Sequence, residues 1–395
     1  MKEGWVTKKL GEVCEKTGTI NPLTQPEVEF RYIDISSVCN ASFSIQETTW
    51  IKGKEAPSRA RKLIYFGDVL FATVRPTLLR VAIVPQYLDR NICSTGFFVA
   101  RPNQNFEGRL LFYYLISPSF LKEISKLERG ASYPAVTDSD IREQKISFPV
   151  NKAEQQRIAT ILDAAFADLA QAKANAQKNL ANAKELFASE LNTIFTRKGE
   201  GWVTKKLGEV ASVSYGYTDS ASSQKKGPKF LRITDIQDNC VKWDDVPYCT
   251  IDAKSLSKFK LKDGDIVFAR TGASTGKSYL VTNPPEAVFA SYLIRVQLNT
   301  NFIVPEFLSL YFLTKKYWDH IETGISGSAQ GGFNATKLAE LLIPFPHVQN
   351  QQRIVSRFNE LSEHSKKLEA VYTQKLSLYN EMKQSLLQKA FSGEL

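Results

Sequence analysis

The stretch with the clearest potential for chemistry is a glycine- and hydroxyl-rich loop that carries a lysine. It runs from Gly272 to Ser278 (GASTGKS) and follows a run of β-forming residues. It resembles the phosphate-binding P-loop, in which four residues separate two glycines so that backbone N–H groups can surround the phosphates. Here three residues lie between Gly272 and Gly276, and residues 73–78, at the equivalent place earlier in the chain, share none of the motif. We therefore expect no nucleotide site, although the loop could approach a phosphate backbone.

Other catalytic patterns are also incomplete. The run from Asn283 to Glu286 (NPPE) resembles the Asn-Pro-Pro-aromatic motif of amino-methyltransferases, but Glu286 cannot stack on a flipped base as an aromatic residue would. We expect a turn there. The three histidines, His320, His347 and His364, have no metal-ligand spacing, and the five cysteines include no CxxC pair. The sequence thus predicts no metal site, no bound cofactor and no catalysis by this chain alone.

Basic side chains with hydroxyl or amide neighbours are better candidates for function. Arginine, glutamine and asparagine suit the edges of DNA bases, whereas lysine and serine suit phosphates. The net charge of +10 is compatible with a nucleic-acid partner. The candidate DNA-binding residues are Arg59, Arg61, Lys62, Arg75, Arg80, Arg129, Ser132, Tyr133, Thr137, Lys225, Lys226, Arg270, Ser274, Thr275, Lys277, Ser328, Gln330 and Asn334.

These candidates lie on two copies of one scaffold. The decapeptide GWVTKKLGEV at residues 4–13 recurs unchanged at residues 201–210, 197 positions later. A repeat of this length indicates a tandem duplication in which each copy is a domain. We predict domains at 1–150 and 201–347, followed by long helices at 151–200 and 348–395. Because the decapeptide is identical in both copies, we expect a structural role, with its tryptophans packing each domain against the helices.

The two copies share one order of expected elements, which gives each a mixed α/β character. The expected strands are 31–36, 69–74, 96–100 and 146–149 in the first copy and 231–236, 264–269 and 343–346 in the second. Residues 110–115 and 307–312 predict short core helices, and residues 130–137 and 327–334 predict loops. The loop contents differ between the copies, and loops on a rigid scaffold are where binding usually resides.

Each domain is followed by a segment without proline or glycine, in which apolar residues recur at spacings of three and four. This spacing predicts a coiled-coil seam, with each helix on the order of 60 Å long. The seam positions are Ile158, Leu162, Ala165, Leu169, Ala172 and Ala176, then Ile354, Phe358, Leu361, Leu368, Tyr372, Tyr379, Met382 and Leu386, with breaks at Ser365 and Lys375. We expect the two helices to pair antiparallel. The alternative is that each helix lies on its own domain.

Composition places the chain among cytoplasmic globular proteins. Hydrophobic residues make up 43% of it, and no apolar run is long enough to span a membrane. The N-terminal residues lack the apolar core of a signal peptide. An odd number of cysteines without paired spacing favours reduced thiols.

Taken together, these features resemble the specificity subunit of type I restriction-modification enzymes. The resemblance rests on the Gly-Trp openings at residues 4 and 201, the loop at 130–134 (GASYP), the junction from Ile343 to Ile354, and the ending at 389–395 (KAFSGEL). It covers the whole chain. It implies an α+β fold in which two target recognition domains are each followed by a long helix, the helices pairing as an antiparallel coiled coil.

The resemblance also implies partners. Such a subunit binds double-stranded DNA, each domain reading one half of a bipartite, asymmetric site, while the helices set the spacing. Two methyltransferase (modification) subunits dock on it and use S-adenosylmethionine to methylate adenines. Restriction subunits add translocation and cleavage that require ATP and Mg²⁺. The chain itself would be non-catalytic and would bind none of these cofactors.

Two other interpretations stay open at this point. One is an enzyme, either a methyltransferase or a nucleotide hydrolase, supported only by the incomplete motifs. The other is a protein-interaction scaffold with helical spacers and no sequence readout. The half-site sequences, the spacer length and the base-contacting residues do not follow from one sequence, since the pairing of side chain and base depends on docking geometry.

Overall fold

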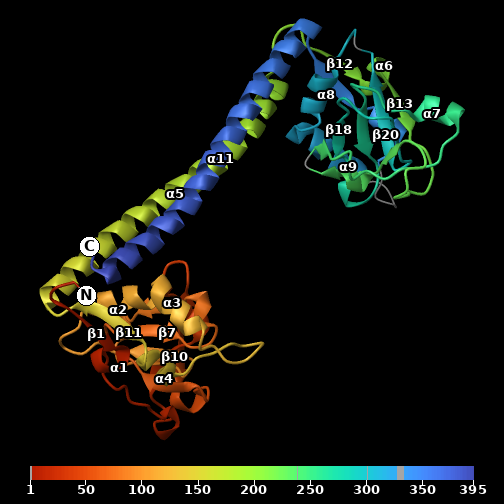
Figure 1. Ribbon diagram of the computed structural model, residues 1–395. Coiled ribbons are helices and arrows are strands. Elements are labelled where there is room, and N and C mark those ends of the chain that lie inside the picture. Colours follow the sequence, from red (N-terminus) through yellow and green to blue (C-terminus); the bar gives the residue numbers. More distant parts are fainter. Residues whose placement is uncertain (1, 238, 300, 327–332) are drawn as a thin grey trace. The chain divides into compact units, whose positions relative to one another are not determined.

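The computed structural model describes residues 2–237, 239–299, 301–326 and 333–395 and is drawn in Figure 1. The chain forms two compact units. Unit 1 consists of Met1–Gln177 with Gln374–Leu395, and unit 2 consists of Lys178–Thr373. Each unit therefore contains one of the duplicated domains and a part of both long helices.

Unit 1 joins its first and last strands in an antiparallel pair, β1 (Trp5–Lys9) with β11 (Lys145–Pro149). A second sheet has the order β5 (Thr49–Lys52), β2 (Glu29–Ile33), β9 (Ile92–Ser94), β6 (Ala60–Leu63), with β2 and β9 parallel. A third has the order β10 (Phe97–Ala100), β7 (Val69–Ala72), β8 (Val81–Ile83). The short strands β3 (Val38–Cys39) and β4 (Ser44–Ile45) form a hairpin. The predicted strands at 69–74, 96–100 and 146–149 are thus present.

The helices of unit 1 cover one face of the β7 sheet. They are α1 (Leu10–Val13), α2 (Gly108–Leu115), α3 (Pro118–Ser125) and α4 (Asp138–Arg142). The buried side of α2 packs on β7 and β8. The largest core joins Phe71, Phe98 and Phe120 to apolar residues of both long helices. The predicted core helix at 110–115 is confirmed, and it lies where it can anchor the long helices to the sheet.

Unit 2 repeats this plan. Strand β12 (Val203–Lys206) pairs with β21 (Leu342–Phe345), and a sheet has the order β13 (Ala211–Tyr215), β20 (Leu293–Leu298), β17 (Ile266–Ala269), β18 (Ser278–Leu280). Two further pairs are β14 (Lys229–Leu231) with β19 (Ala287–Phe289) and β15 (Ile236–Gln237) with β16 (Cys240–Val241). The helices are α6 (Leu207–Val210), α7 (Ala253–Phe259), α8 (Pro305–Tyr311), α9 (Lys315–Ser326) and α10 (Ala335–Ala339).

Two predicted strands are shorter than expected, because side chains turn the backbone. Strand β2 ends at Ile33, and β14 ends at Leu231. In unit 2 the Arg232 N–H donates to the Asp235 carboxylate at 2.8 Å, and residues 233–235 form a 3₁₀ turn. Ser and Asp side chains compete with strand partners for backbone N–H groups in this way. The prediction of a continuous strand over 231–236 was therefore wrong.

Two long helices, α5 (Lys152–Arg197) and α11 (Val348–Ser392), run antiparallel to each other within each unit (Figure 1). In unit 1, Ile158 and Leu162 of α5 share a core with Leu387 and Ala390 of α11. In unit 2, Phe187 of α5 meets Phe358 of α11 with ring centroids 5.4 Å apart. The predicted antiparallel pairing is confirmed. The helices also pack on their domains, so the alternative arrangement is present in part.

The seam of α11 departs from the predicted positions from Leu368 onward. Leu368 and Met382, predicted to lie in the seam, are 41% and 51% exposed. Leu387 and Ala390 are buried instead. A straight α-helix drifts relative to a strict seven-residue repeat, and this drift moves the buried face. Ser365, predicted to be a break, is buried and donates its hydroxyl to the Ala183 carbonyl at 2.6 Å.

A buried glutamine fixes the start of each long helix to its domain. Gln155 of α5 is fully buried, and its amide nitrogen donates to the carbonyls of Pro149 at 2.9 Å and Asn105 at 3.3 Å. Its amide oxygen accepts from the Glu107 N–H at 2.9 Å. Gln351 of α11 makes the same three kinds of bond in unit 2. An amide is needed because the site demands both a donor and an acceptor.

The tryptophans of the repeated decapeptide pack against the helices, as predicted. Trp202 lies edge-on to Phe195 of α5, with ring centroids 5.8 Å apart, and also contacts Phe307 of α8. Trp5 packs on the core that contains α11 and lies against Gly393. The decapeptide is therefore part of the joint between domain and helix.

Candidate nucleic-acid interface

One cluster in unit 1 brings together three of the candidate residues. The guanidinium of Arg75 lies over the Tyr133 ring, 4.6 Å from its centroid, and Arg75 Nη2 donates to the Ser132 carbonyl at 3.2 Å. Tyr133 is 69% exposed. Stacking of this kind contributes about 0.5–1 kcal/mol at an exposed site. The cluster therefore presents an ordered aromatic ring and a mostly unoccupied guanidinium to solvent.

The backbone around this cluster is held in an uncommon conformation. Arg75 and Leu79 flank the 3₁₀ turn Pro76–Leu78 with φ of 49° and 54°. A left-handed conformation at a residue other than glycine costs roughly 1–3 kcal/mol and is found mostly at functional sites. Opposite the turn, the loop containing Tyr133 is closed by two hydrogen bonds between Arg129 and Ala135, both at 2.9 Å. Both sides of the cluster are thus fixed by the fold.

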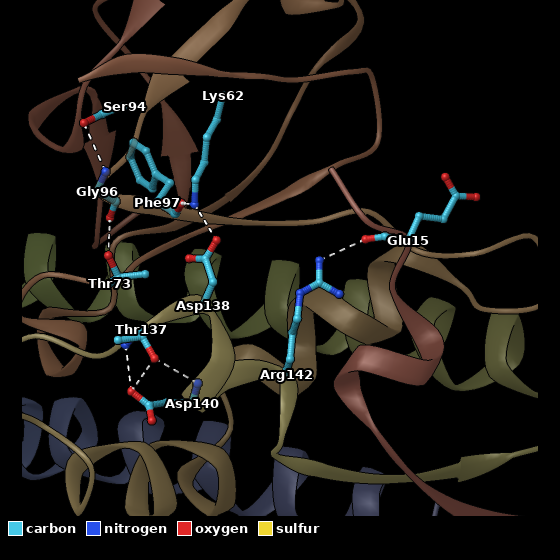
Figure 2. A network of polar contacts seen from close by, with 10 residues as sticks. All are labelled: Glu15, Lys62, Thr73, Ser94, Gly96, Phe97, Thr137, Asp138, Asp140 and Arg142. Carbon is cyan, nitrogen blue, oxygen red and sulfur yellow. Dashed lines mark hydrogen bonds and ion pairs between the residues drawn. The ribbon is translucent and has the colours of Figure 1, made fainter. Parts of the chain in front are cut away.

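Lys62 makes strong contacts inside the domain instead. Its ammonium forms an ion pair with Asp138 at 2.6 Å and donates to the Phe97 carbonyl at 2.7 Å, as Figure 2 shows. Its side chain is 12% exposed. Asp138 is the first residue of α4, where a carboxylate is favoured by the helix dipole. Lys62 therefore ties strand β6 to α4, and its contact with DNA stays a prediction.

Arg129 and Thr137 hold the ends of the loop that carries Tyr133. Thr137 caps α4, and its hydroxyl and N–H both donate to Asp140 (Figure 2). Arg129 adds two hydrogen bonds to the same carboxylate, at 2.8 and 3.1 Å. The hydrogen bonds from Arg129 and then from Thr137 lower the pKa of Asp140 to about 2. The loop is therefore clamped at its base while its tip stays exposed.

The remaining candidates of unit 1 differ in their surroundings. Arg80 donates to the carbonyls of Ile35 and Val38, at 3.1 and 2.7 Å, and so fastens the β3–β4 region. Arg61 donates to the side chain of Asn21. Arg59 is exposed, next to the strand β6. Only Arg59 among these three is placed on the surface without a described hydrogen bond from its side chain.

In unit 2 the P-loop-like segment is a β-hairpin. Strand β17 leads into a 3₁₀ turn at Gly272–Ser274 and then into β18, which pairs antiparallel with β17. A P-loop requires a helix after the glycine-rich turn, with its N-terminus aimed at the phosphate. Strand β18 stands where that helix would be, so this segment does not have the geometry of a P-loop. Thr275 is buried and bonds to the Gly272 carbonyl, whereas Lys277 is exposed.

Arg270 forms a second stacked pair in unit 2. Its guanidinium lies 4.9 Å from the centroid of the Tyr215 ring, and the Tyr215 hydroxyl accepts from the Ala335 N–H at 3.0 Å. Tyr215 comes from strand β13, whereas Tyr133 comes from a loop. Each unit thus holds an arginine on a tyrosine where β7 or β17 ends, but the two pairs are built differently.

Other candidates of unit 2 are dispersed. Lys225 and Lys226 are exposed, Ser274 is half-buried, and Asn334 caps α10 as Thr137 caps α4. Ser328 and Gln330 lie outside the described residues, as does most of the predicted loop at 327–334. DNA contact by all of these residues stays a prediction.

The sequence analysis missed a further arginine between two aromatic rings. Arg31 of β2 lies 5.1 Å from the Trp50 ring and 5.6 Å from the Tyr87 ring, and both rings are more than half exposed. Arg31 and Trp50 face each other across the β2–β5 pair. A tryptophan beside two threonines in a stretch of β-forming residues was the available signal. In unit 2, Lys229 over Tyr248 is a smaller version of this pair.

Two further features of the chain bear on other functions. Among the described residues, no group of three or more His, Cys, Asp or Glu side chains could hold a metal ion. Within the same part of the chain, every helix is too short or too polar to cross a membrane.

Comparison with known proteins identifies the family to which this architecture belongs. The family model described as type I restriction modification DNA specificity domain matches residues 2–179 and again residues 199–376. The chain belongs to this family. The two matched segments are the two copies of the domain, and the chain is a DNA specificity subunit of the type I restriction-modification kind.

Individual relatives agree with this assignment. The type I restriction enzyme EcoKI specificity subunit of Escherichia coli K12 is 25% identical over 324 residues, covering 77% of this chain and 69% of the relative. The StySPI specificity subunit of Salmonella potsdam is 25% identical over 321 residues, with the same coverage of 77% and 69%. The HsdS subunit from Thermoanaerobacter tengcongensis has a similar structure, with a TM-score of 0.75, 28% identity and coverage of 100% and 98%. A chain from a structural study of type I complex assembly and conformational transition gives a TM-score of 0.83 at 28% identity, covering 100% and 99%.

Proposed function

We propose that this specificity subunit reads a bipartite, asymmetric DNA site, with each domain reading one half. The observation that carries the proposal is the contrast between the two copies. The scaffold is repeated down to Gln155 and Gln351, while the arginine–tyrosine pairs, Arg75 with Tyr133 and Arg270 with Tyr215, differ in geometry. A repeated scaffold with different contact surfaces reads two different sequences in a related way.

The chemistry of both pairs suits base recognition in a duplex. An arginine can donate two hydrogen bonds to guanine in the major groove, and a tyrosine below it fixes the plane of the guanidinium. The overall charge of +10 adds attraction to the phosphate backbone without sequence preference. Specificity then comes from a few ordered side chains and affinity from many basic ones.

The long helices supply the spacer and a docking surface in this proposal. Leu368, Val371, Leu378 and Met382 are exposed on α11 at spacings of three, seven and four, so that they share one helical face. An exposed apolar face of this kind marks an interaction surface. We assign it to methyltransferase subunits, two of which would bind the complex and use S-adenosylmethionine.

The catalytic steps belong to partner subunits in this account. Methyltransferase subunits would modify adenines, and restriction subunits would use ATP and Mg²⁺ to translocate and cleave DNA, in the cytoplasm. The P-loop-like segment is a hairpin turn, and the NPPE segment lies in the connection between β18 and β19. Because neither has the geometry of its motif, we assign these cofactors to the partner subunits.

A binding experiment tests the proposal. The complex of this chain with its methyltransferase subunits is titrated with a duplex that carries the site mapped from methylated adenines, and with a shuffled duplex, at several salt concentrations. We expect a preference for the mapped site of roughly 10³-fold or more that persists as salt rises. Equal affinity for both duplexes at every salt concentration would instead favour a scaffold without sequence readout.

The spacer role has its own test. Inserting or deleting one helical turn near residues 172–183 of α5, with a matching change in α11, should alter the number of base pairs between the two half-sites. If the complex still methylates DNA and the number of base pairs between the half-sites is unchanged, the helices do not set the spacing.

A further inference from the structure

The loop that carries Tyr133 is exposed at its tip and hydrogen-bonded at its base. It leaves the domain at Arg129 and returns at Ala135, and these residues exchange both backbone hydrogen bonds at 2.9 Å. Arg75 N–H donates to the Pro134 carbonyl at 2.7 Å, and Val136 N–H donates to the Thr73 carbonyl at 3.0 Å. In Figure 1 this yellow-orange loop extends away from the body of unit 1, beyond β10. The loop is therefore tied to the end of β7 along its returning strand.

The exposed Tyr133 ring has a stacked arginine on one face. One face is covered by the Arg75 guanidinium at 4.6 Å, and that guanidinium is anchored by its bond to the Ser132 carbonyl. Gly130, with φ of 98°, allows the turn that brings residue 133 to the tip. A ring ordered before binding loses little conformational freedom when it meets a partner. The ring thus has the properties of a preformed contact.

The chemistry of the loop favours a nucleic-acid base as the partner of this ring. The loop from Arg129 to Thr137 (RGASYPAVT) contains no acidic residue, and Arg75 lies beside its tip. Every base presents a π-face on which an aromatic side chain can stack. The Tyr133–Pro134 pair is apolar and narrow, which are the properties of side chains that enter between base steps and unstack them.

We propose that Tyr133 inserts at a base step of the first half-site and stacks on a base there, with Arg75 as the positioning residue that holds the ring. This inference rests on the proposed function, since it concerns how the first domain engages its half-site. Specificity at that step comes from the deformability of the DNA as well as from hydrogen bonds.

The sequence of the second domain differs at the equivalent place. Gln330 stands 197 positions after Tyr133, and residues 327–332 (GSAQGG) contain no aromatic side chain. The Tyr215 ring cannot take over the role, because it lies on strand β13 with its hydroxyl bonded to the Ala335 N–H. We therefore assign this insertion to the first half-site.

The test uses the complete complex with methyltransferase subunits and duplexes in which 2-aminopurine replaces one adenine of either half-site. The adenine that is methylated is left in place, because a methyltransferase itself flips its target base out of the stack. Wild-type complex should raise the fluorescence of the probe in the first half-site and leave the probe in the second nearly unchanged. Tyr133→Ala should abolish this rise and weaken binding roughly 10- to 100-fold, while Tyr133→Phe should stay close to wild type. The slope of affinity against salt should not change, because no phosphate contact is lost.

Phe66→Ala is the matched control, since it removes another exposed aromatic ring of the same unit that lies outside the candidate interface. It should bind as wild type does. An unchanged affinity of Tyr133→Ala, or an equal loss with Phe66→Ala, would overturn the inference, as would a change in the salt slope. If the wild-type complex distinguishes its site from a shuffled duplex, and Tyr133→Ala has the same affinity and the same probe fluorescence as wild type, only this inference fails. If the wild-type complex makes no such distinction, the proposed function itself fails.

Discussion

Replacing Gln155 by leucine should destabilise unit 1 without touching the proposed DNA interface. The side chain is fully buried and makes three hydrogen bonds, to Pro149, Asn105 and Glu107, at 2.9, 3.3 and 2.9 Å. Each such bond contributes about 1 kcal/mol net, and leucine leaves all three backbone partners buried without a replacement. We expect a loss of about 3 kcal/mol, which corresponds to roughly 6–12 °C in Tm for a unit of this size.

Calorimetry and chemical denaturation of the full chain measure this effect. Unit 1 should unfold earlier in Gln155→Leu, and unit 2 should unfold earlier in Gln351→Leu, whose amide makes the equivalent bonds. Gln177→Leu is the matched control, because it changes an exposed glutamine of the same helix α5. A change below about 0.5 kcal/mol in Gln155→Leu, comparable to a surface substitution, would refute the reasoning that these bonds hold the helix to the domain.

Three further predictions concern other parts of the chain. Burial, and to a lesser degree Lys173, lowers the pKa of Lys383 from 10.5 to about 8, so the folded state binds fewer protons than the unfolded state between these values. The full shift corresponds to about 3 kcal/mol, and because the side chain is only partly buried we expect stability to rise by about 1 kcal/mol from pH 8 to 10.5. Denaturation at each pH should show this rise in the wild type and not in Lys383→Met. The double substitution Leu368→Glu and Met382→Glu should change the Tm of the free chain by no more than about 2 °C. It should weaken the binding of methyltransferase subunits, measured by calorimetric titration. Unchanged binding would show that this face of α11 is not the docking surface. The hydrogen bonds from Arg129 lower the pKa of Asp140, so the contribution of this carboxylate to stability is lost as pH falls from 3.8 towards 2. Asp140→Asn should therefore make the loop at 129–137 more sensitive to proteolysis at pH 7. Equal sensitivity would contradict the view that Asp140 holds the base of this loop.

The duplicated plan was accessible from sequence because identity survives at the joints. The decapeptide packs at the junction of domain and helix in both copies, and so does the glutamine that begins each helix. Strands with buried residues on both faces, such as Val69–Ala72, can be recognised in the sequence as runs of apolar residues. Features that one local stretch determines were therefore predicted well.

Features that depend on distant residues were not predictable in the same way. From the sequence, Lys62 looks like an exposed basic residue. In the fold it pairs with Asp138, which lies 76 residues later in the chain. The strand expected at 231–236 ended early because a single carboxylate, Asp235, captured a backbone N–H. On α11, extrapolation of a strict heptad from Ile354 placed Leu368 and Met382 in the seam, whereas the helix turns them outward.

The candidate interface was likewise only partly predictable from the sequence. Arg75, Ser132 and Tyr133 were singled out as basic or polar loop residues, but only the fold shows that they touch. Arg31 was overlooked because its function as part of a stack depends on Trp50, which comes from the neighbouring strand. Residue type alone indicates what a side chain can do, and the sheet register decides which side chains do it together.

The central claim is that each domain reads one half-site independently, and an exchange of domains tests it most directly. Residues 14–150 are replaced by the equivalent segment of a relative, and methylated adenines are mapped across the genome of a host that also expresses the methyltransferase subunits. We predict that one half of the methylated site changes while the other half and the spacer length stay the same. A change in both halves, or in neither, would contradict the account.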